Sequence, residues 1–446
     1  MNSDLNLNSE PKQRAPFQGA FFKKRVLITG HTGFKGAWLT EWLLALGAKV
    51  TGFSLPPPTV PSLFEQLDLE KRIDHRIGDV RDLEAVTKVM LETRPDFVFH
   101  LAAQPLVRLS YDQPVETYAT NVMGTVNVLE ALRKFKSLGL GLRLSGGTNP
   151  LKLNLETSTS RSVVAVFITT DKCYENKEWV HGYREVDPMG GHDPYSSSKG
   201  AAELVISAYR NSYFSHTSTS NLSLNRCNVL VASARAGNVI GGGDWALDRI
   251  VPDCIRHLIK GEAIPVRNKV ATRPWQHVLE PLSGYLTLAS RLAEGVEGES
   301  LGLGAEVPTE SERSSDLNFN LSLKRAALAK HASLCSAFNF GPNVTSNRTV
   351  ADLVQEALKH WEGKWKDMSD PNAPHEAKLL SLTIDKAFHL LDWTPVWNFE
   401  ETVKNTISWY RETHLGTAAA VDITRAQIAE YTNDAATIGL PWAGIR

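Results

Sequence analysis

Two patterns of apolar residues alternate along residues 25–135. Short runs rich in β-branched and aromatic residues, such as RVLIT from residue 25 and DFVFHLA from residue 96, are typical of buried strands. Longer segments between them, such as GAWLTEWLLALG from residue 36, place apolar residues at helical spacing. Strands that alternate with amphipathic helices predict an α/β fold with a doubly wound parallel sheet of the Rossmann-like kind.

The pattern changes after residue 240, where short segments rich in Gly, Pro, Trp and Arg replace the alternation of strands and helices. We expect these later segments to form a smaller substrate-binding lobe at the carboxyl edge of the sheet. Three stretches biased toward Ser, Thr, Asn, Gly and Leu predict weakly ordered surface insertions, near 137–161, 214–226 and 296–333. The predicted parts of the chain are a disordered tail (1–20), the Rossmann-like domain (21–240), the lobe (241–415) and a C-terminal extension with a terminal helix (416–446).

Composition narrows the classes of partner. The formal net charge is −1, with 42% hydrophobic and 22% charged residues, which is ordinary for a globular protein. This balance favours neither nucleic acid nor an anionic membrane, although it is compatible with a local basic pocket for a phosphate ester. No apolar run approaches the roughly 18 residues that span a bilayer. The N-terminus also lacks the apolar core of a secretory signal.

The four cysteines are scattered along the sequence, at Cys173, Cys227, Cys254 and Cys335. Metal sites and disulfide frameworks use clustered or patterned cysteines, so we expect reduced structural thiols and no bound metal. Together with the composition, this pattern predicts a soluble protein of a reducing compartment, the cytoplasm, that binds neither nucleic acid nor membrane.

The stretch VLITGHTGFKGAWL places Gly30, Gly33 and Gly36 between the first strand and the first helix. Residues without side chains let backbone amides and a helix N-terminus approach a pyrophosphate. Glycines also make ordinary tight turns, but here the flanking strand and helix are those of a dinucleotide-binding sheet. We therefore predict a nicotinamide dinucleotide as cofactor.

The end of the second strand does not decide between NAD and NADP. An acidic residue about 20 positions after the glycine turn normally binds the ribose 2′-hydroxyl of NAD. This chain has Phe53 and Ser54 there, and no Arg for a 2′-phosphate, so NAD is favoured without being settled. Asp79 in IGDVRD either hydrogen-bonds the adenine amino group or caps the next helix, and the sequence favours neither role.

Tyr195 and Lys199 are four residues apart, which puts both on one face of a helix. A free phenol has a pKa of about 10, and a neighbouring ammonium stabilises the phenolate. Such a pair can remove the proton of an alcohol whose carbon gives up hydride. Thr170 ends the apolar run SVVAVFITT, where its hydroxyl can bond the same alcohol oxygen. Tyr–Lys pairs also occur by chance on exposed helices, but with the glycine turn these three residues predict a hydride-transfer site.

Several motifs carry a resemblance to a known family. They are TGHTGFKG, GDVRD, HLAAQ, NVMGTVNVLEA and YSSSK, which resemble the motifs of extended short-chain dehydrogenases/reductases. More narrowly, TTDKCYENKEW, DPMGGHDPYSSSKGAAELV and RAGNVIGGGDWALDRIVPD resemble the CDP-glucose 4,6-dehydratases, over roughly residues 20–410 apart from the insertions. For NAD binding, the resemblance adds further residues to the three glycines and Asp79: Phe34, Val80, Leu101, Ala102, Ala103, Tyr195 and Lys199.

The resemblance also implies a reaction, the conversion of CDP-glucose to CDP-4-keto-6-deoxyglucose with loss of water. After oxidation at carbon 4, elimination across carbons 5 and 6 needs a base and an acid close together. Asp171, kept protonated by burial, is the expected acid. Lys172 stands where many related dehydratases carry Glu, and acts either as the base at carbon 5 or as a charged stabiliser of the enolate. Otherwise the two residues only cap a turn and face solvent.

Cations are expected around the two phosphates of such a substrate. Guanidinium groups pair bidentately with phosphate, which favours Arg249 and Arg273, and Trp245 or Trp275 either stacks on the base or sugar or belongs to the core. The resemblance adds Gln104, Arg108 and Asn238 to the substrate-binding residues, and it includes His375 and Glu376 without giving them a role.

Other functions compete with this prediction. A dehydratase for GDP-mannose or dTDP-glucose fits the same motifs, whereas a 4-epimerase needs no charged pair after Thr170. A catalytically silent NAD-binding regulatory protein is an alternative from another class, against which the intact Tyr195 and Lys199 argue. The resemblance further implies a homodimer or homotetramer, paired through helices such as 114–135 and 194–212.

Overall fold

The computed structural model describes residues 15–138, 162–214, 228–301, 333–369 and 379–444. Most of the three expected insertions and Cys227 lie outside these ranges. Residues 296–301, which we assigned to the third insertion, instead continue helix α9 (Leu279–Leu301).

Seven strands form one parallel sheet, in the order β3-β2-β1-β4-β5-β6-β11. This arrangement confirms the predicted doubly wound α/β fold. The strand order reverses between β1 and β4, and open α/β sheets bind ligands in the crevice at such a point. The strands are β1 (Arg25–Thr29), β2 (Lys49–Ser54), β3 (Asp74–Ile77), β4 (Phe97–His100), β5 (Ser162–Thr169), β6 (Asn228–Arg235) and β11 (Ala337–Asn339).

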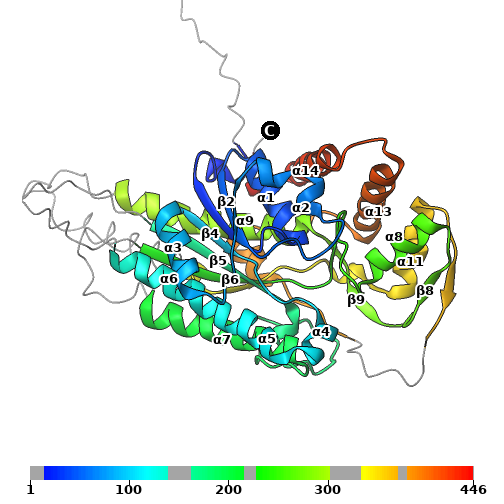
Figure 1. Ribbon diagram of the computed structural model, residues 1–446, viewed down its shortest axis with the longest axis horizontal. Helices are drawn as coiled ribbons and strands as arrows, with labels where there is room; N and C mark the ends of the chain where they lie inside the picture. Colours follow the sequence, from blue (N-terminus) through cyan, green and yellow to red (C-terminus); the bar gives the residue numbers. More distant parts are fainter. Residues whose placement is uncertain (1–14, 139–161, 215–227, 302–332, 370–378, 445–446) are drawn as a thin grey trace, which may run out of the picture.

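Both faces of the sheet are covered around its central strands, which explains why β1, β4 and β5 are almost continuously apolar. In β5, Val163 and Phe167 pack on one face with helices α3, α6 and α7, whereas Val164 and Val166 pack on the other face with α1 and α9. Figure 1 shows α6 and α7 on one side of the sheet and α1 on the other. These helices are α1 (Phe34–Ala45), α3 (Leu83–Thr93), α6 (Gly124–Leu138) and α7 (Pro194–Tyr213).

The long helix predicted from residue 115 has an irregular middle. Helix α5 (Pro114–Tyr118) continues into α6 through a π-helical turn, η3 (Ala119–Met123). A π turn inserts one residue into the helical repeat and often occurs at functional sites. Here it contains the buried residue Asn121.

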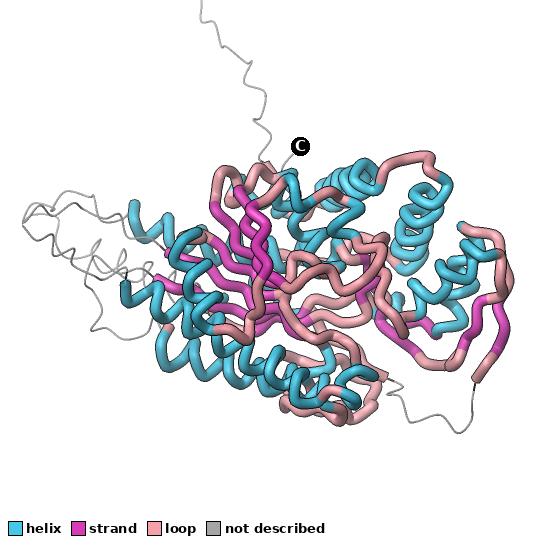
Figure 2. The backbone as a smooth tube through the Cα atoms, viewed as in Figure 1, coloured by secondary structure: helices cyan, strands magenta, loops and turns pink. Residues whose placement is uncertain are grey.

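Many segments from residue 239 onward form a smaller lobe at one end of the sheet (Figures 1 and 2). However, α9 and β11 belong to the sheet and its cover, so the predicted division at residue 240 does not separate the two parts cleanly. The two-stranded sheets of the lobe pair β8 with β13 and β9 with β12, while β10 pairs with β7. Its elements are β7 (Val239–Ile240), α8 (Ile250–Lys260), β8 (Ile264–Val266), β9 (Thr272–Pro274), β10 (Gln276–His277), η7 (Val344–Ser346), β12 (Asn347–Thr349), α11 (Val350–His360), β13 (Trp365–Asp367), α12 (Asp385–Leu391) and α13 (Phe399–Leu415).

The two ends of the described chain meet on the α1 side of the sheet. Residues Pro16–Gly19 form a short 3-10 helix, η1, in which Phe17 is buried and stacks on Trp442 with ring centroids 5.0 Å apart. Residues 15–20 therefore differ from the disordered tail that we expected, because one aromatic side chain anchors them to the C-terminal segment. The extension forms α14 (Ala420–Thr437), which packs against α1, and η8 (Pro441–Ala443).

Short elements connect these parts: α2 (Leu63–Gln66), η2 (Leu69–Lys71), α4 (Val107–Asp112) and η4 (Asp171–Cys173). Within the described ranges, no helix is both long enough and apolar enough to cross a membrane.

Candidate active site

The glycine turn lies in the crevice between β1 and β4. Gly30 has a φ of +79°, and a Cβ atom there would come within 2.6 Å of the Ala102 backbone nitrogen. A Cβ on Gly36 would lie 2.1 Å from the Gly30 carbonyl oxygen, so a side chain there would push α1 away from the turn. Gly33 is the N-cap of α1, and no side chain caps this helix. Its first N–H groups can therefore bind a pyrophosphate, and the turn fits the predicted dinucleotide.

The loop after β4 forms the wall opposite the glycine turn. The Leu101 N–H donates to the Thr29 carbonyl at 3.0 Å, and the Ala102 N–H lies 3.4 Å from Thr29 Oγ1. Ala103 follows on this loop, whereas Phe34 begins α1 on the other side. This placement agrees with their predicted contact with the cofactor, which stays a prediction.

The end of β2 and the loop after β3 lie where the adenosine half of a dinucleotide is expected. Ser54 Oγ lies 2.8 Å from Thr32 Oγ1. Asp79 accepts hydrogen bonds of 2.8 and 2.6 Å from the Arg81 guanidinium, which lowers the pKa of the Asp79 carboxyl. Asp82 is the residue that caps α3, where it accepts two backbone N–H groups. The capping interpretation of Asp79 is therefore wrong, and its adenine contact, with that of the neighbouring Val80, stays a prediction.

Thr170, Asp171 and Tyr195 meet at the carboxyl end of β5. The Thr170 hydroxyl donates to Asp171 Oδ1 at 2.9 Å and lies near enough to the Tyr195 phenol to influence its ionisation. Tyr195 belongs to the first turn of α7, which Asp193 caps. Asp171 is buried, with 1% exposure, so the alternative in which it caps a turn in solvent is wrong. Lys172 is half-buried in η4 beside it.

Burial has the largest effect on the pKa values of Tyr195 and Lys199. Burial raises the pKa of Tyr195 to about 12, although the nearby Thr170 hydroxyl and the Arg249 charge act in the opposite direction. Burial lowers the pKa of Lys199 to about 8, and the Glu203 carboxylate opposes this effect. Tyr195 therefore needs additional positive charge beside it to act as a base near neutral pH, and an oxidised nicotinamide ring carries such a charge.

Asp171 lies against the backbone that follows β6. A Cβ atom on Gly237 would come within 2.0 Å of the Asp171 carboxylate carbon. Asn238 Nδ2 is 3.4 Å from Asp171 Oδ2. We predicted Asn238 at the pyrophosphate, and that role stays a prediction, but in this structure its side chain contacts the Asp171 carboxylate.

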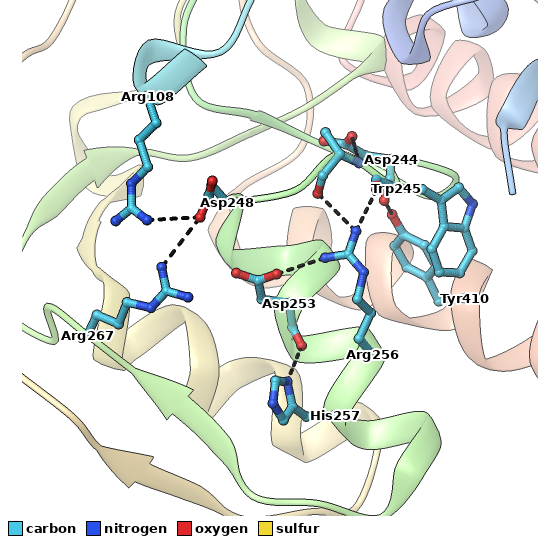
Figure 3. A network of polar contacts seen from close by, with 10 residues as sticks. Arg108, Asp244, Trp245, Asp248, Asp253, Arg256, His257, Arg267 and Tyr410 are labelled. Atoms are coloured by element: carbon cyan, nitrogen blue, oxygen red, sulfur yellow. Dashed lines mark hydrogen bonds and ion pairs between the residues drawn. The ribbon is translucent and has the colours of Figure 1, made fainter. Parts of the chain in front are cut away.

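Two of the predicted phosphate-binding arginines lie beside the segment that joins β7 to α8. Arg249 Nη1 is 2.8 Å from Asp244 Oδ2. Arg108, on α4, and Arg267, after β8, both approach Asp248 Oδ1, at 2.9 and 3.4 Å (Figure 3). Three guanidinium groups against two carboxylates leave a net positive charge, which suits a diphosphate.

The two tryptophans considered for base stacking use their indole N–H groups elsewhere. Trp275 is buried, and its N–H donates to the Arg348 carbonyl at 3.0 Å. Trp245 donates to Gln66 Oε1 at 3.0 Å and packs edge-on against Tyr410. These contacts favour the alternative in which both rings belong to the core.

Other predicted substrate residues lie apart from the acid. The Gln104 amide donates to Thr117 Oγ1 at 2.9 Å, so its side chain faces α5. Arg273, on β9, donates to the carbonyl of the preceding residue at 2.8 Å. His375 and Glu376 lie outside the described residues. The binding roles of Gln104 and Arg273 stay predictions.

Sequence reasoning missed two polar residues of this site. Asn121, in the π turn, donates to Ser198 Oγ at 2.9 Å and to the Gln104 carbonyl at 3.1 Å, which joins α7 to the loop after β4. Lys35, in the first turn of α1, is half-buried beside Arg249, and its desolvation together with that charge lowers the pKa of Lys35 to about 8. A lysine within an otherwise small and apolar turn was the available signal for Lys35.

The fold and the site define a class of protein. A seven-stranded Rossmann-like sheet, a glycine turn and a buried Thr–Tyr–Lys arrangement are those of an extended short-chain dehydrogenase/reductase. In the part of the chain that the structure describes, no three side chains that ligate metals lie together.

Comparisons with known proteins narrow this class to a family. Residues 27–291 match the family model described as GDP-mannose 4,6 dehydratase. CDP-glucose 4,6-dehydratase of Salmonella typhimurium is 43% identical over 390 residues, which cover 87% of this chain and 90% of that protein. A dTDP-glucose 4,6-dehydratase of Xanthomonas campestris is 24% identical, over 86% of this chain and 92% of that protein. This chain belongs to the GDP-mannose 4,6-dehydratase family.

Solved structures agree with the fold. UDP-glucose 4-epimerase of Thermotoga maritima, solved with UDP-glucose, superimposes with a TM-score of 0.62 at 18% identity, over 87% of this chain and 99% of that one. The dTDP-glucose 4,6-dehydratase of Bacillus anthracis, solved with NAD, gives a TM-score of 0.59 at 18% identity, over 88% and 98%.

Proposed function

We propose that this protein is an NAD-dependent CDP-glucose 4,6-dehydratase, a hydro-lyase that forms CDP-4-keto-6-deoxyglucose and water. The observation that carries the proposal is the buried Asp171, which accepts a hydrogen bond from Thr170 near the Tyr195 phenol. A 4-epimerase or a simple dehydrogenase needs no acid at this place. The relative named for CDP-glucose is 43% identical, whereas relatives named for dTDP-glucose are 22–24% identical, which supports cytidine as the base.

NAD is the proposed cofactor, since solved dehydratases of this fold contain it. The glycine turn and the N-terminus of α1 would hold its pyrophosphate, and Lys199 would orient its ribose. Bound NAD⁺ would accept a hydride from carbon 4 of the sugar and later return it to carbon 6.

The proposed proton transfers use residues of this chain. Tyr195 removes the proton of the 4-hydroxyl, and Thr170 holds that oxygen beside the phenol. The ketone formed at carbon 4 acidifies the hydrogen on carbon 5, and Lys172 takes that proton. Asp171 donates a proton to the departing 6-hydroxyl, which leaves as water. Carbon 5 then regains a proton when carbon 6 is reduced, so the cofactor ends in its starting state.

Replacing Lys172 by Ala should stall the reaction after the first oxidation. Loss of a general base slows a step by about 10²–10⁴-fold, so the reduced cofactor should accumulate while the keto-deoxy product does not. Stopped-flow absorbance of NADH with CDP-glucose and NAD⁺ measures this directly. Lys177→Ala, at an exposed lysine paired with Glu175 in the same loop, is the matched control. Full product formation by Lys172→Ala would remove Lys172 from the mechanism.

The substrate assignment has its own test. The protein is incubated with NAD⁺ and, in parallel, with CDP-glucose, dTDP-glucose and GDP-mannose. We expect turnover to be highest with CDP-glucose, measured as the alkaline ultraviolet absorbance of a 4-keto-6-deoxy sugar. Preferential turnover of another nucleotide sugar would contradict the cytidine assignment, and formation of the 4-epimer would contradict the dehydratase.

We also propose that two copies pair through the helices that carry the site. Large apolar side chains are exposed along them: Tyr111 on α4, Val115 and Tyr118 on α5, Met123 on η3 and Leu204 on α7. Two helices from each copy would bury this face. Sedimentation should give a dimer or a dimer of dimers, and Val115→Glu with Leu204→Glu should give monomers. A monomeric wild type would contradict the pairing.

A further inference from the structure

A buried ion pair lies directly behind the residues proposed to move protons. Glu203, one helical turn after Lys199 on α7, faces Arg235 at the end of β6, with Oε2 and Nη2 2.8 Å apart. The two side chains are only 4% and 5% exposed. Burying two charges is costly unless further hydrogen bonds complete both groups. The other partners of this pair therefore indicate its role.

The carboxylate of Glu203 joins α7 to the sheet. It accepts hydrogen bonds from Thr169 Oγ1 at 2.5 Å and from Ser233 Oγ at 2.8 Å. Thr169 is the last residue of β5 and immediately precedes Thr170. These bonds and the Arg235 guanidinium outweigh burial and lower the pKa of Glu203, so the carboxylate is ionised.

The guanidinium of Arg235 joins the same pair to the turn that carries the acid. Its Nη1 donates to the Tyr174 hydroxyl at 2.7 Å, and the guanidinium lies 5.0 Å from the centre of that ring. The Tyr174 hydroxyl donates to Asn339 Oδ1 at 2.7 Å, and its ring stacks on Tyr183. Tyr174 directly follows η4 (Asp171–Cys173). One ion pair thus contacts the elements on both sides of the site.

We propose that Glu203 and Arg235 are a positioning pair. The pair fixes helix α7, which carries Tyr195 and Lys199, relative to the turn η4, which carries Asp171. Glu203 also supplies the negative charge that keeps the neighbouring Lys199 protonated. The inference rests on the proposed function, because a reaction that uses the phenol and the acid on one sugar requires both to be fixed together. Neither residue touches the reacting atoms.

The surroundings of Lys199 make Glu203 the important charge. Cys173 and His100 face Lys199 from η4 and β4, and burial keeps both neutral because it raises the pKa of the thiol and lowers the pKa of the imidazole to about 3. Lys35, on α1, adds positive charge near Lys199. Of these groups, Glu203 is the one that favours the ammonium.

The charge role predicts a shifted pH profile. Glu203→Gln keeps the shape but removes the charge, and an opposite charge beside a titrating group changes its pKa by roughly 1–3 units. The alkaline limb of NADH formation should therefore move about one pH unit or more to lower pH. A displacement of the helix should also slow this step by about 10²-fold. Single-turnover absorbance across pH measures both effects.

The link to the turn predicts an effect on a different step. Tyr174→Phe leaves both charges in place but removes the hydroxyl that accepts from Arg235. We expect water loss to slow by about tenfold or more, with transient accumulation of NADH, while the pH profile of the first oxidation stays unchanged. An unchanged rate of water loss would contradict the link between the pair and the turn.

Two further variants separate positioning from plain stability. The double variant Glu203→Leu with Arg235→Met should recover thermal stability relative to Glu203→Gln, because no unpaired buried charge remains, yet it should keep the shifted profile. Glu41→Gln is the matched control. Glu41 lies on α1, and its buried carboxylate is bound by Arg72 and Arg425, which belong to other elements. This control should lower the melting temperature and leave the profile unchanged.

The outcomes distinguish this inference from the proposed function. A Glu203→Gln profile that matches the wild type, or a double variant that regains the wild-type profile, would overturn the positioning pair. If the wild type does not turn over CDP-glucose, the proposed function fails. The pH dependence of NAD⁺ binding, followed by tryptophan fluorescence, then still reports whether Glu203→Gln changes the ionisation of Lys199.

Discussion

Tyr195→Phe should lower the rate of CDP-4-keto-6-deoxyglucose formation by about 10²–10⁴-fold, the usual effect of losing a general acid–base group. In the proposed mechanism the phenol takes the first proton, and its ring is buried on α7, so Phe fills the same space. No NADH should form in a single turnover, because proton removal and hydride loss belong to one step. Turnover and NADH absorbance measure the effect together.

The matched control for Tyr195→Phe is Tyr213→Phe, at the far end of the same helix, where the side chain is 49% exposed. This variant should retain wild-type turnover. The contrast with Lys172→Ala is equally informative, because one variant should stop before NADH appears and the other after it. NADH formation by Tyr195→Phe at the wild-type rate would contradict the assignment of the phenol.

Acidification should destabilise the fold strongly, through three buried histidines. Burial lowers the pKa values of His31, His100 and His277 to about 3, with help from His75 at His31 and Lys199 at His100. Each is neutral in the folded protein and protonates near pH 6.5 when unfolded, so its stabilisation is present above 6.5 and is lost as the pH falls toward 3. Each histidine then lowers the free energy of unfolding by about 1.4 kcal/mol per pH unit, and the three together lower it by about 4 kcal/mol per pH unit.

Glu280 acts in the opposite direction. Burial raises the pKa of its carboxyl to about 7, so the fold gains about 1.4 kcal/mol per pH unit between pH 7 and 4.5. The net loss in that window below pH 6.5 is therefore about 3 kcal/mol per pH unit. Urea unfolding at several pH values measures this slope. His277→Asn, which keeps an acceptor for the Leu279 N–H, should reduce the slope by about 1.4 kcal/mol per pH unit; an unchanged slope would contradict the assignment.

The sheet could be predicted from the sequence because its central strands are buried on both faces and are therefore almost continuously apolar. The π turn could not, since one additional residue within residues 115–135 barely changes a 3.6-residue repeat. The order at residues 15–20 was also missed. It depends on the stacking of Phe17 on Trp442, a contact between residues at opposite ends of the sequence.

The candidate site likewise contains residues that the sequence predicted and residues that it did not. Thr170, Tyr195 and Lys199 follow from local spacing and from the end of a strand, whereas the role of Asp171 came from the family resemblance. The Glu203–Arg235 pair and the position of Asp171 against Gly237 depend on contacts between residues far apart in the sequence, which no local pattern reveals. Asn238 is an intermediate case, because its motif was visible but its contact with the acid was not.

Gly237 determines where the Asp171 carboxylate can lie. A single methyl group there would reach within 2.0 Å of Asp171 Cγ. The carboxylate therefore fits only because this residue, just after the neighbouring strand β6, has no side chain. Even the small change Gly237→Ala should therefore displace the Asp171 carboxylate from its place beside Thr170.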